Sequence, residues 1–339
     1  MFIGDLMNNN KLRLDKVYIN YIKKRLDGMN YHFISLIIDK LVSFIECSFV
    51  DIQIILNSGS ITDEKITKDF IDMLRVMERK FLHMLQVIDI AINLSEINHY
   101  ESYQQIANIL VATFHDFGRI LEIHKVGTNM GNNKVNHTTL GLSYLFEGKN
   151  DRERIREYLS EELYLIYRDL LYTGIAYHGT KDVPYSNLSP LAKAVVKDIR
   201  DTDKLAIMSS FVDPNTDMDS VFHMSFESLA QIPIHDITVK EIMSHKLIDR
   251  SNKDVPYDRM RQYISHIGFI YDINSPLLYD YLYLTHWLEK YICHVRRYLS
   301  GENQDKMEEI EAECLDFLRK KQSHNINAGK FGYKVFSKK

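Results

Sequence analysis

Glycine and proline are scarce in this chain of 339 residues, which contains 14 glycines and 6 prolines. Average usage of about 7% and 5% would supply roughly twice as many of these two residues, which interrupt helices and form turns. An all-β sandwich or barrel needs many such turns. The scarcity therefore argues against both β architectures and favours helices.

Cysteine is rare as well. Cys47, Cys293 and Cys314 are odd in number, far apart and free of any CxxC spacing. This usage argues against a disulfide framework or a zinc knuckle and predicts a reducing, cytoplasmic location. The richest apolar stretch, residues 33–56, is interrupted by four charged residues. Neither a membrane span nor a signal peptide is predicted.

No charge of one sign dominates. The 42 basic and 46 acidic residues give a net charge of −4, which removes the general electrostatic argument for a nucleic-acid binder. The motifs GxxxxGK[ST], GxGxxG, GxSxG and HExxH are absent. The hydrophobic content of 45% is nevertheless sufficient for a substantial core.

Helical periodicity is what the sequence does contain, and it predicts an all-α bundle. We expect an N-terminal helical extension over 1–60, a core over 61–212, a C-terminal helical region over 213–321 packed on the core, and a basic tail over 322–339. Within these parts we expect a break at Gly28, a long helix from Ile61, a helix ending near Gly118, and further helices over 134–146, 151–177, 189–208, 276–299 and 305–321.

The candidate chemistry rests on histidine and aspartate. His115 and Asp116 end an apolar helix, and His83 lies on an inward line of the long helix. Asp203 falls on the apolar stripe of helix 189–208, where a carboxylate must be neutralised by a cation, either a metal ion or an arginine, or be protonated. Asp201 falls with two lysines on the other face, so we expect a surface ion pair there. His137 and His178 stand where loops meet helices, and each could equally be a cap or a surface histidine.

The order of these residues resembles that of the HD-domain superfamily of metal-dependent phosphohydrolases, of the HD-x-G-R type. Residues 112–119 resemble its "ALLHDIGR" helix, and residues 199–205 resemble its "IRDADKL" segment. The resemblance covers about residues 70–210. Asn136, Gly179 and Thr202 depart from the usual pattern, so the resemblance does not identify the substrate.

The resemblance implies two divalent metal ions. His83, His115 and Asp203 would hold one ion, His137 and His178 the other, and Asp116 would bridge them. An imidazole-rich shell suits Mn, Fe, Ni or Zn. The implied reaction is hydrolysis of a phosphate monoester or diester by metal-activated water, the substrate being a nucleotide or a related small phosphorylated metabolite.

Three cationic residues are candidates for contact with the substrate phosphate. Arg119 lies one turn beyond His115 and could stabilise the developing charge, or it could instead pair with Glu122. Lys134 and Lys181 each lie three residues from a predicted histidine ligand, and surface solvation is the alternative role for both.

Two other functions stay open. The first is a regulatory protein that binds a phosphorylated ligand without turning it over. The second is an HD nuclease acting on single strands, which the net charge disfavours. A membrane partner is not expected, and the sequence leaves homo-oligomerisation open.

Overall fold

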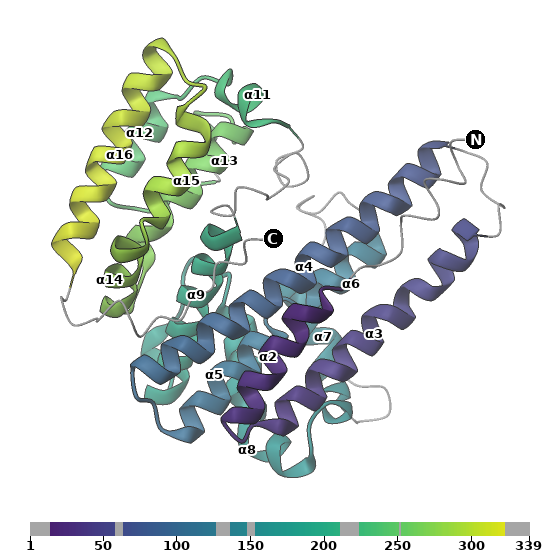
Figure 1. The fold of residues 1–339 in the computed structure, drawn as a ribbon. Helices are drawn as coiled ribbons and strands as arrows, with labels where there is room; N and C mark the ends of the chain where they lie inside the picture. The colour runs from purple at the N-terminus through teal and green to yellow at the C-terminus, as the bar shows by residue number, and fades with distance from the viewer. Residues whose placement is uncertain are drawn as a thin grey trace. The chain divides into compact units, whose positions relative to one another are not determined.

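The computed structural model describes residues 14–57, 64–126, 136–147, 153–210, 224–250 and 252–322. Every regular element within these ranges is helical and none is a strand, which confirms the predicted all-α fold class (Figure 1). The chain divides into two compact units, Met1–Ile199 and Arg200–Lys339. Except for Gln322, the predicted basic tail lies outside the described residues.

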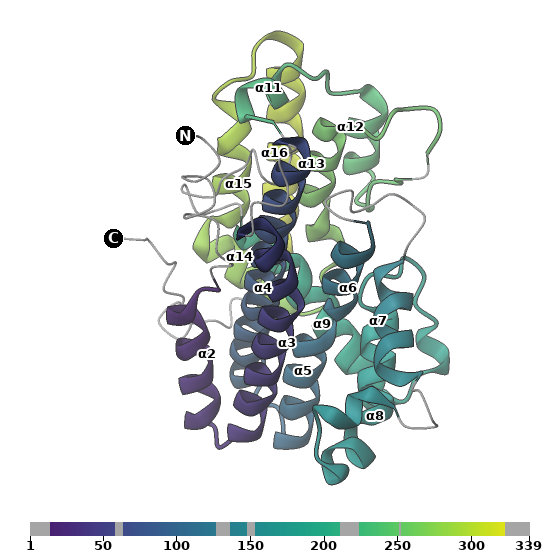
Figure 2. The same ribbon diagram turned by 90° about the vertical axis from the view of Figure 1, so that its right-hand side faces the viewer.

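The first unit is a bundle in which a long helix packs against its neighbours on several sides. Its elements are α2 (Lys16–Gly28), α3 (His32–Asn57), α4 (Glu64–Ile97), α5 (Ser102–Phe114), α6 (Phe117–Val126), α7 (His137–Phe146), η2 (Arg154–Glu157), α8 (Glu161–Tyr177), η3 (Tyr185–Asn187) and the first half of α9 (Pro190–Ser210). Helices α2, α3 and α4 lie side by side, as Figures 1 and 2 show, and α4 also contacts α5 and α6. The apolar residues of α4 are therefore buried on two sides.

Side-chain caps determine where several of these helices begin. Asp15 accepts a hydrogen bond from the Tyr18 N–H at the start of α2. Asn136 accepts from Thr138 and Thr139 at the start of α7, and Ser160 caps α8. Capping by Asn, Asp or Ser satisfies N–H groups that have no partner within the helix. Asn136, which departs from the HD pattern, thus has a structural role of its own.

A partly buried ion-pair network attaches α2 to α4. Arg25 donates to Asp89 at 2.5 Å and to the Asn93 side chain at 3.0 Å, and its second nitrogen donates to Glu96 at 3.0 Å. Asp89 is almost completely buried, and burial raises the pKa of its carboxyl despite the arginine. Helix α2 thereby supplies the counter-charge for α4, the helix that carries His83.

The second unit is also helical. It comprises the second half of α9, α11 (Phe226–Ala230), α12 (Asp236–Met243), α13 (Arg259–Ile267), η4 (Gly268–Asp272), α14 (Pro276–Thr285), α15 (Trp287–Arg296) and α16 (Gly301–Lys321). Helix α16 packs against α12, α14 and α15. The predicted single helix over 276–299 is wrong, because His286 adopts a left-handed backbone conformation (φ +54°) that separates α14 from α15.

Asp201 corrects a second prediction. It is fully buried rather than on the surface, and its carboxylate accepts from the backbone N–H groups of Asn274 and Ser275 just before α14. Burial raises the pKa of this carboxyl. The lysine and arginine on the same side of α9, Lys204 and Arg200, both pair with Asp272. The charged residues led to the prediction that this helix face is exposed to solvent, but because they pair with one another the face can be buried.

The core of the second unit contains a reciprocal tyrosine pair. The rings of Tyr263 and Tyr291 stack with centroids 4.5 Å apart, and each hydroxyl donates to the backbone carbonyl of the other residue. His266 contacts the Tyr291 hydroxyl through Nδ1 at 3.1 Å. Helices α13 and α15 are joined by buried polar groups as well as by apolar packing.

We predict that His266 makes the second unit sensitive to acid. Burial, together with the charge of Arg250, lowers the pKa of His266 to about 3, whereas an unfolded histidine titrates near 6.5. Above pH 6.5 the residue is neutral in both states. Below it only the unfolded chain gains the proton, so the free energy of unfolding should fall by up to about 1.4 kcal/mol per pH unit. Urea denaturation followed by the fluorescence of Trp287, the only tryptophan, measures this slope.

In His266→Gln the slope below pH 6.5 should become shallower. His286→Asn is the control, because it replaces an exposed histidine of the same unit by a residue that also tolerates the left-handed conformation. This variant should leave the slope unchanged. Equal slopes in wild type and His266→Gln would contradict the prediction.

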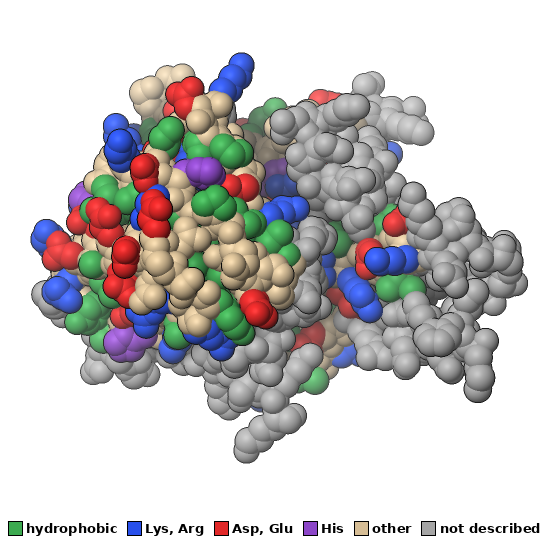
Figure 3. All heavy atoms as spheres, turned by 90° about the horizontal axis from the view of Figure 1, so that it is seen from above, with side chains coloured by type: hydrophobic (Ala, Val, Ile, Leu, Met, Phe, Trp, Pro, Cys, Tyr) green, Lys and Arg blue, Asp and Glu red, His purple; other side chains and the backbone are tan. Residues whose placement is uncertain are grey.

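Acidic and basic side chains of the described residues are interspersed over the face seen in Figure 3. Among the described residues, no helix combines the length and the hydropathy required to cross a membrane.

Candidate metal centre

His115 and Asp116 occupy the short break between two helices. Helix α5 ends at Phe114, His115 is its C-terminal cap, and α6 begins at Phe117. The sequence predicted one helix ending near Gly118. The structure instead places Gly118 inside α6, so that prediction was wrong. The break allows consecutive side chains to point to a common site, which two successive residues within a regular helix, about 100° apart, do less readily.

Helix ends also set the orientation of two histidine rings. Nδ1 of His115 lies 2.8 Å from the carbonyl oxygen of Ala112, and Nδ1 of His178 lies 2.7 Å from that of Ile175. Carbonyls in the last turn of a helix have no partner further along the helix, and an oxygen of this kind can only accept. Each Nδ1 therefore carries the proton, and in the neutral ring Nε2 presents its lone pair. Such hydrogen bonds are typical of histidines that bind metals.

Two groups of neighbouring histidine and aspartate side chains lie at this site, and we number them by their place in the chain. Asp116, His137 and His178 form the second histidine group. Oδ1 of Asp116 lies 3.5 Å from Nε2 of His137 and 3.6 Å from Nε2 of His178, and the two Nε2 atoms are 3.3 Å apart. Two tetrahedral ligands at about 2.1 Å from an ion are about 3.4 Å from each other. The triangle therefore has the dimensions of a metal site, although a proton between the two imidazoles would also satisfy the 3.3 Å contact.

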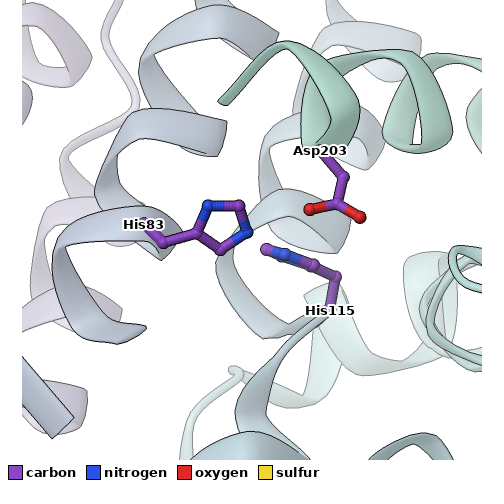
Figure 4. A group of neighbouring side chains, drawn as sticks. All are labelled: His83, His115 and Asp203. Atoms are coloured by element: carbon purple, nitrogen blue, oxygen red, sulfur yellow. The ribbon is translucent and has the colours of Figure 1, made fainter. Parts of the chain in front are cut away.

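His83, His115 and Asp203 form the first histidine group, whose ligand atoms lie within 4.8 Å of one another. Figure 4 shows the two imidazole rings and the carboxylate pointing toward one another from α4, the end of α5 and α9. His83 and His115 are buried. Asp203 is half-buried and lies on α9.

Asp116 also faces His83. Oδ2 of Asp116 lies 3.9 Å from Nε2 of His83, whereas Oδ1 faces His137 and His178. The rings of His83, His115, His178 and His137 follow one another with centroids 5.3–5.7 Å apart. One carboxylate thus presents a separate oxygen to each histidine group, which is the geometry of a bridging ligand.

The electrostatics keep the ligand atoms in the forms that bind metals. Burial by itself raises the pKa of Asp116, but the neighbouring imidazoles of His178 and His115 and the charges of Lys80 and Arg119 outweigh it and hold the pKa well below its usual value. Burial lowers the pKa of His137 to about 3. At neutral pH the aspartate is therefore ionised and His137 is neutral, as metal coordination requires.

The three cationic candidates have different surroundings. Arg119 donates to the buried Glu122 at 2.8 Å, the pairing that the sequence offered as an alternative, and its Nε also lies 3.9 Å from Asp116 Oδ1. Lys181 is exposed in the loop after α8. Lys134 lies outside the described residues. Of these three, Arg119 is the candidate with a contact to Asp116 among the described residues.

Sequence reasoning missed Lys80. Its Nζ lies 3.9 Å from Oδ2 of Asp116. The available signal was the spacing to His83, because side chains three residues apart on a helix lie one above the other.

We predict that His178→Ala removes one ion and leaves the other. His178 belongs to the second histidine group alone, so only that group loses a ligand. Metal analysis of the purified protein should give close to two divalent ions in wild type and close to one in the variant. Equal stoichiometry in the two proteins would indicate a single-metal site, with a proton shared between His137 and His178.

The described residues thus provide an all-helical scaffold and buried groups of histidine and aspartate that could hold metal ions. In comparisons with protein-family models, with curated proteins and with solved structures, nothing matched this chain.

Proposed function

We propose that this protein is a metal-dependent phosphohydrolase of the HD type. The observation that carries the proposal is Asp116, whose two oxygens face two different histidine groups. The donor set of imidazoles and carboxylates suits Mn, Fe, Ni or Zn. Two such ions, when bound, would supply an activated water and neutralise charge on a phosphoryl group.

The roles of the chain's own residues follow from their contacts. The carbonyls of Ala112 and Ile175 orient His115 and His178 before any ligand arrives, so no reorganisation is needed. Arg119, held by Glu122, lies beside Asp116 where it can neutralise charge on the phosphate oxygens. None of these residues is proposed as a covalent nucleophile.

The substrate that we propose is a phosphate ester of a nucleotide or of a related small metabolite. The test is a phosphate-release screen over nucleotides and cyclic nucleotides with Mn²⁺-loaded protein, preceded by metal analysis. Activity should disappear after removal of metal by a chelator and return when Mn²⁺ is restored. Full activity in chelator-treated, metal-free protein would refute the proposal.

Two other outcomes would point to the alternative functions. Tight binding of a nucleotide without turnover would indicate a regulatory protein. Salt-dependent binding and cleavage of a single-stranded oligonucleotide would indicate a nuclease.

A further inference from the structure

Two cationic side chains flank Asp116, one on each side. Nζ of Lys80 lies 3.9 Å from Oδ2, the oxygen that faces His83. Nε of Arg119 lies 3.9 Å from Oδ1, the oxygen that faces His137 and His178. One cation therefore lies on the side of each histidine group.

Lys80 and Arg119 are more exposed than His137, His83 and His178, the histidines that contact Asp116. The side chains of Lys80 and Arg119 are 28% and 26% exposed, whereas that of His178 is 3% exposed. Part of each cationic side chain is therefore accessible to a ligand from solvent. Glu122 is buried and fixes the guanidinium of Arg119.

The charges around Asp116 favour a highly charged anion. Two divalent ions would outweigh the carboxylates of Asp116 and Asp203. Arg119 is paired with Glu122, and Lys80 brings a positive charge to the other oxygen of Asp116. A terminal phosphate carries about −1.5 to −2 at pH 7, whereas a phosphodiester carries about −1. A positive site that excludes part of the solvent discriminates strongly between these two anions.

We propose that Lys80 is a substrate-binding residue that, with Arg119, selects a terminal phosphate group over a phosphodiester. The inference rests on the proposed function for its catalytic consequence, because hydrolysis would then favour monoesters. The expected difference in affinity between a terminal phosphate and a phosphodiester does not depend on turnover. The ammonium of Lys80 contacts a phosphate oxygen on the side of the first histidine group, and Arg119 contacts one on the side of the second.

The test compares Lys80→Met with Lys68→Met, both in Mn²⁺-loaded full-length protein. Lys68 is an exposed lysine three turns earlier on α4 and serves as the matched control. Isothermal titration with inorganic phosphate and with dimethyl phosphate measures binding, and p-nitrophenyl phosphate with its bis-ester measures turnover. Lys80→Met should weaken phosphate binding by about 10-fold or more, the effect of one lost charge-assisted hydrogen bond, and raise KM for the monoester. Dimethyl phosphate and the bis-ester should be affected much less.

Each other outcome has a defined meaning. Unchanged phosphate affinity in Lys80→Met, with two ions still bound, would overturn the inference and leave Lys80 as a counter-charge for Asp116 in the metal-free protein. Equal losses for both classes of ligand would overturn the selectivity. If wild type hydrolyses neither ester but Lys80→Met selectively loses affinity for phosphate, the proposed function fails and the phosphate site stands.

Discussion

Replacing Asp116 by asparagine should abolish turnover. The amide has nearly the same shape but no negative charge, and it offers each histidine group a poorer ligand or none. Replacing groups that merely orient metal ligands already costs 10- to 100-fold in activity or metal affinity. Loss of the one residue that faces both groups should therefore lower kcat/KM by more than about 100-fold and weaken both ions.

The measurement is kcat/KM at saturating Mn²⁺, together with metal stoichiometry after dialysis. Asp169→Asn is the matched control, because its side chain is 90% exposed and lies far along α8 from His178. Comparable rates in wild type and Asp116→Asn would show that any phosphohydrolase activity comes from a contaminant, or that the protein only binds its ligand.

Replacing Gly118 by alanine should have the largest effect on the scaffold. A Cβ at this position would lie 1.8 Å from the carbonyl oxygen of His137 and 2.8 Å from the backbone nitrogen of Gly141. Both are backbone atoms, so no side-chain rotation relieves the overlap. The start of α7 must move away from α6, and His137 moves with it. We expect a loss of about 3 kcal/mol or more in the free energy of unfolding, the upper range for overpacking.

The same change should also remove an ion. Because His137 belongs to the second histidine group, Gly118→Ala that remains folded at low temperature should bind close to one ion instead of two. Gly179→Ala is the control, because a Cβ at this position, next to His178 in the chain, would meet nothing within 4 Å. Two ions and wild-type stability in Gly118→Ala would contradict the close approach of α6 and α7.

Local sequence patterns predicted the individual residues of the candidate site but not their grouping. The histidines and Asp116 could be selected from the sequence because each polar side chain interrupts an apolar stripe or stands at a helix end. Their grouping could not be derived from periodicity, and the sequence offered it only through a resemblance. Lys80 was overlooked because its spacing to His83 does not distinguish it from Arg79, which lies four residues from the same histidine. Its proximity to Asp116 arises from the packing of α4 against α5 and α6.

Asp201 and Gly118 are the two residues for which prediction from the local sequence failed most clearly. Asp201 was assigned to the surface because lysines share its side of the helix, yet Asp272 and the backbone before α14 make that side a buried polar contact. Gly118 was interpreted as a helix end, whereas its missing side chain makes room for the backbone of α7.

By itself the sequence determined the helical class and most helix positions and offered the candidate metal ligands, because these depend on composition, caps and the periodicity of neighbouring residues. Only the tertiary structure decided which oxygen of Asp116 faces which histidines, which cations accompany it and which charged residues are buried. Those properties depend on contacts between residues far apart in the chain, such as Asp116 with His178 and Arg200 with Asp272, and no local pattern contains them.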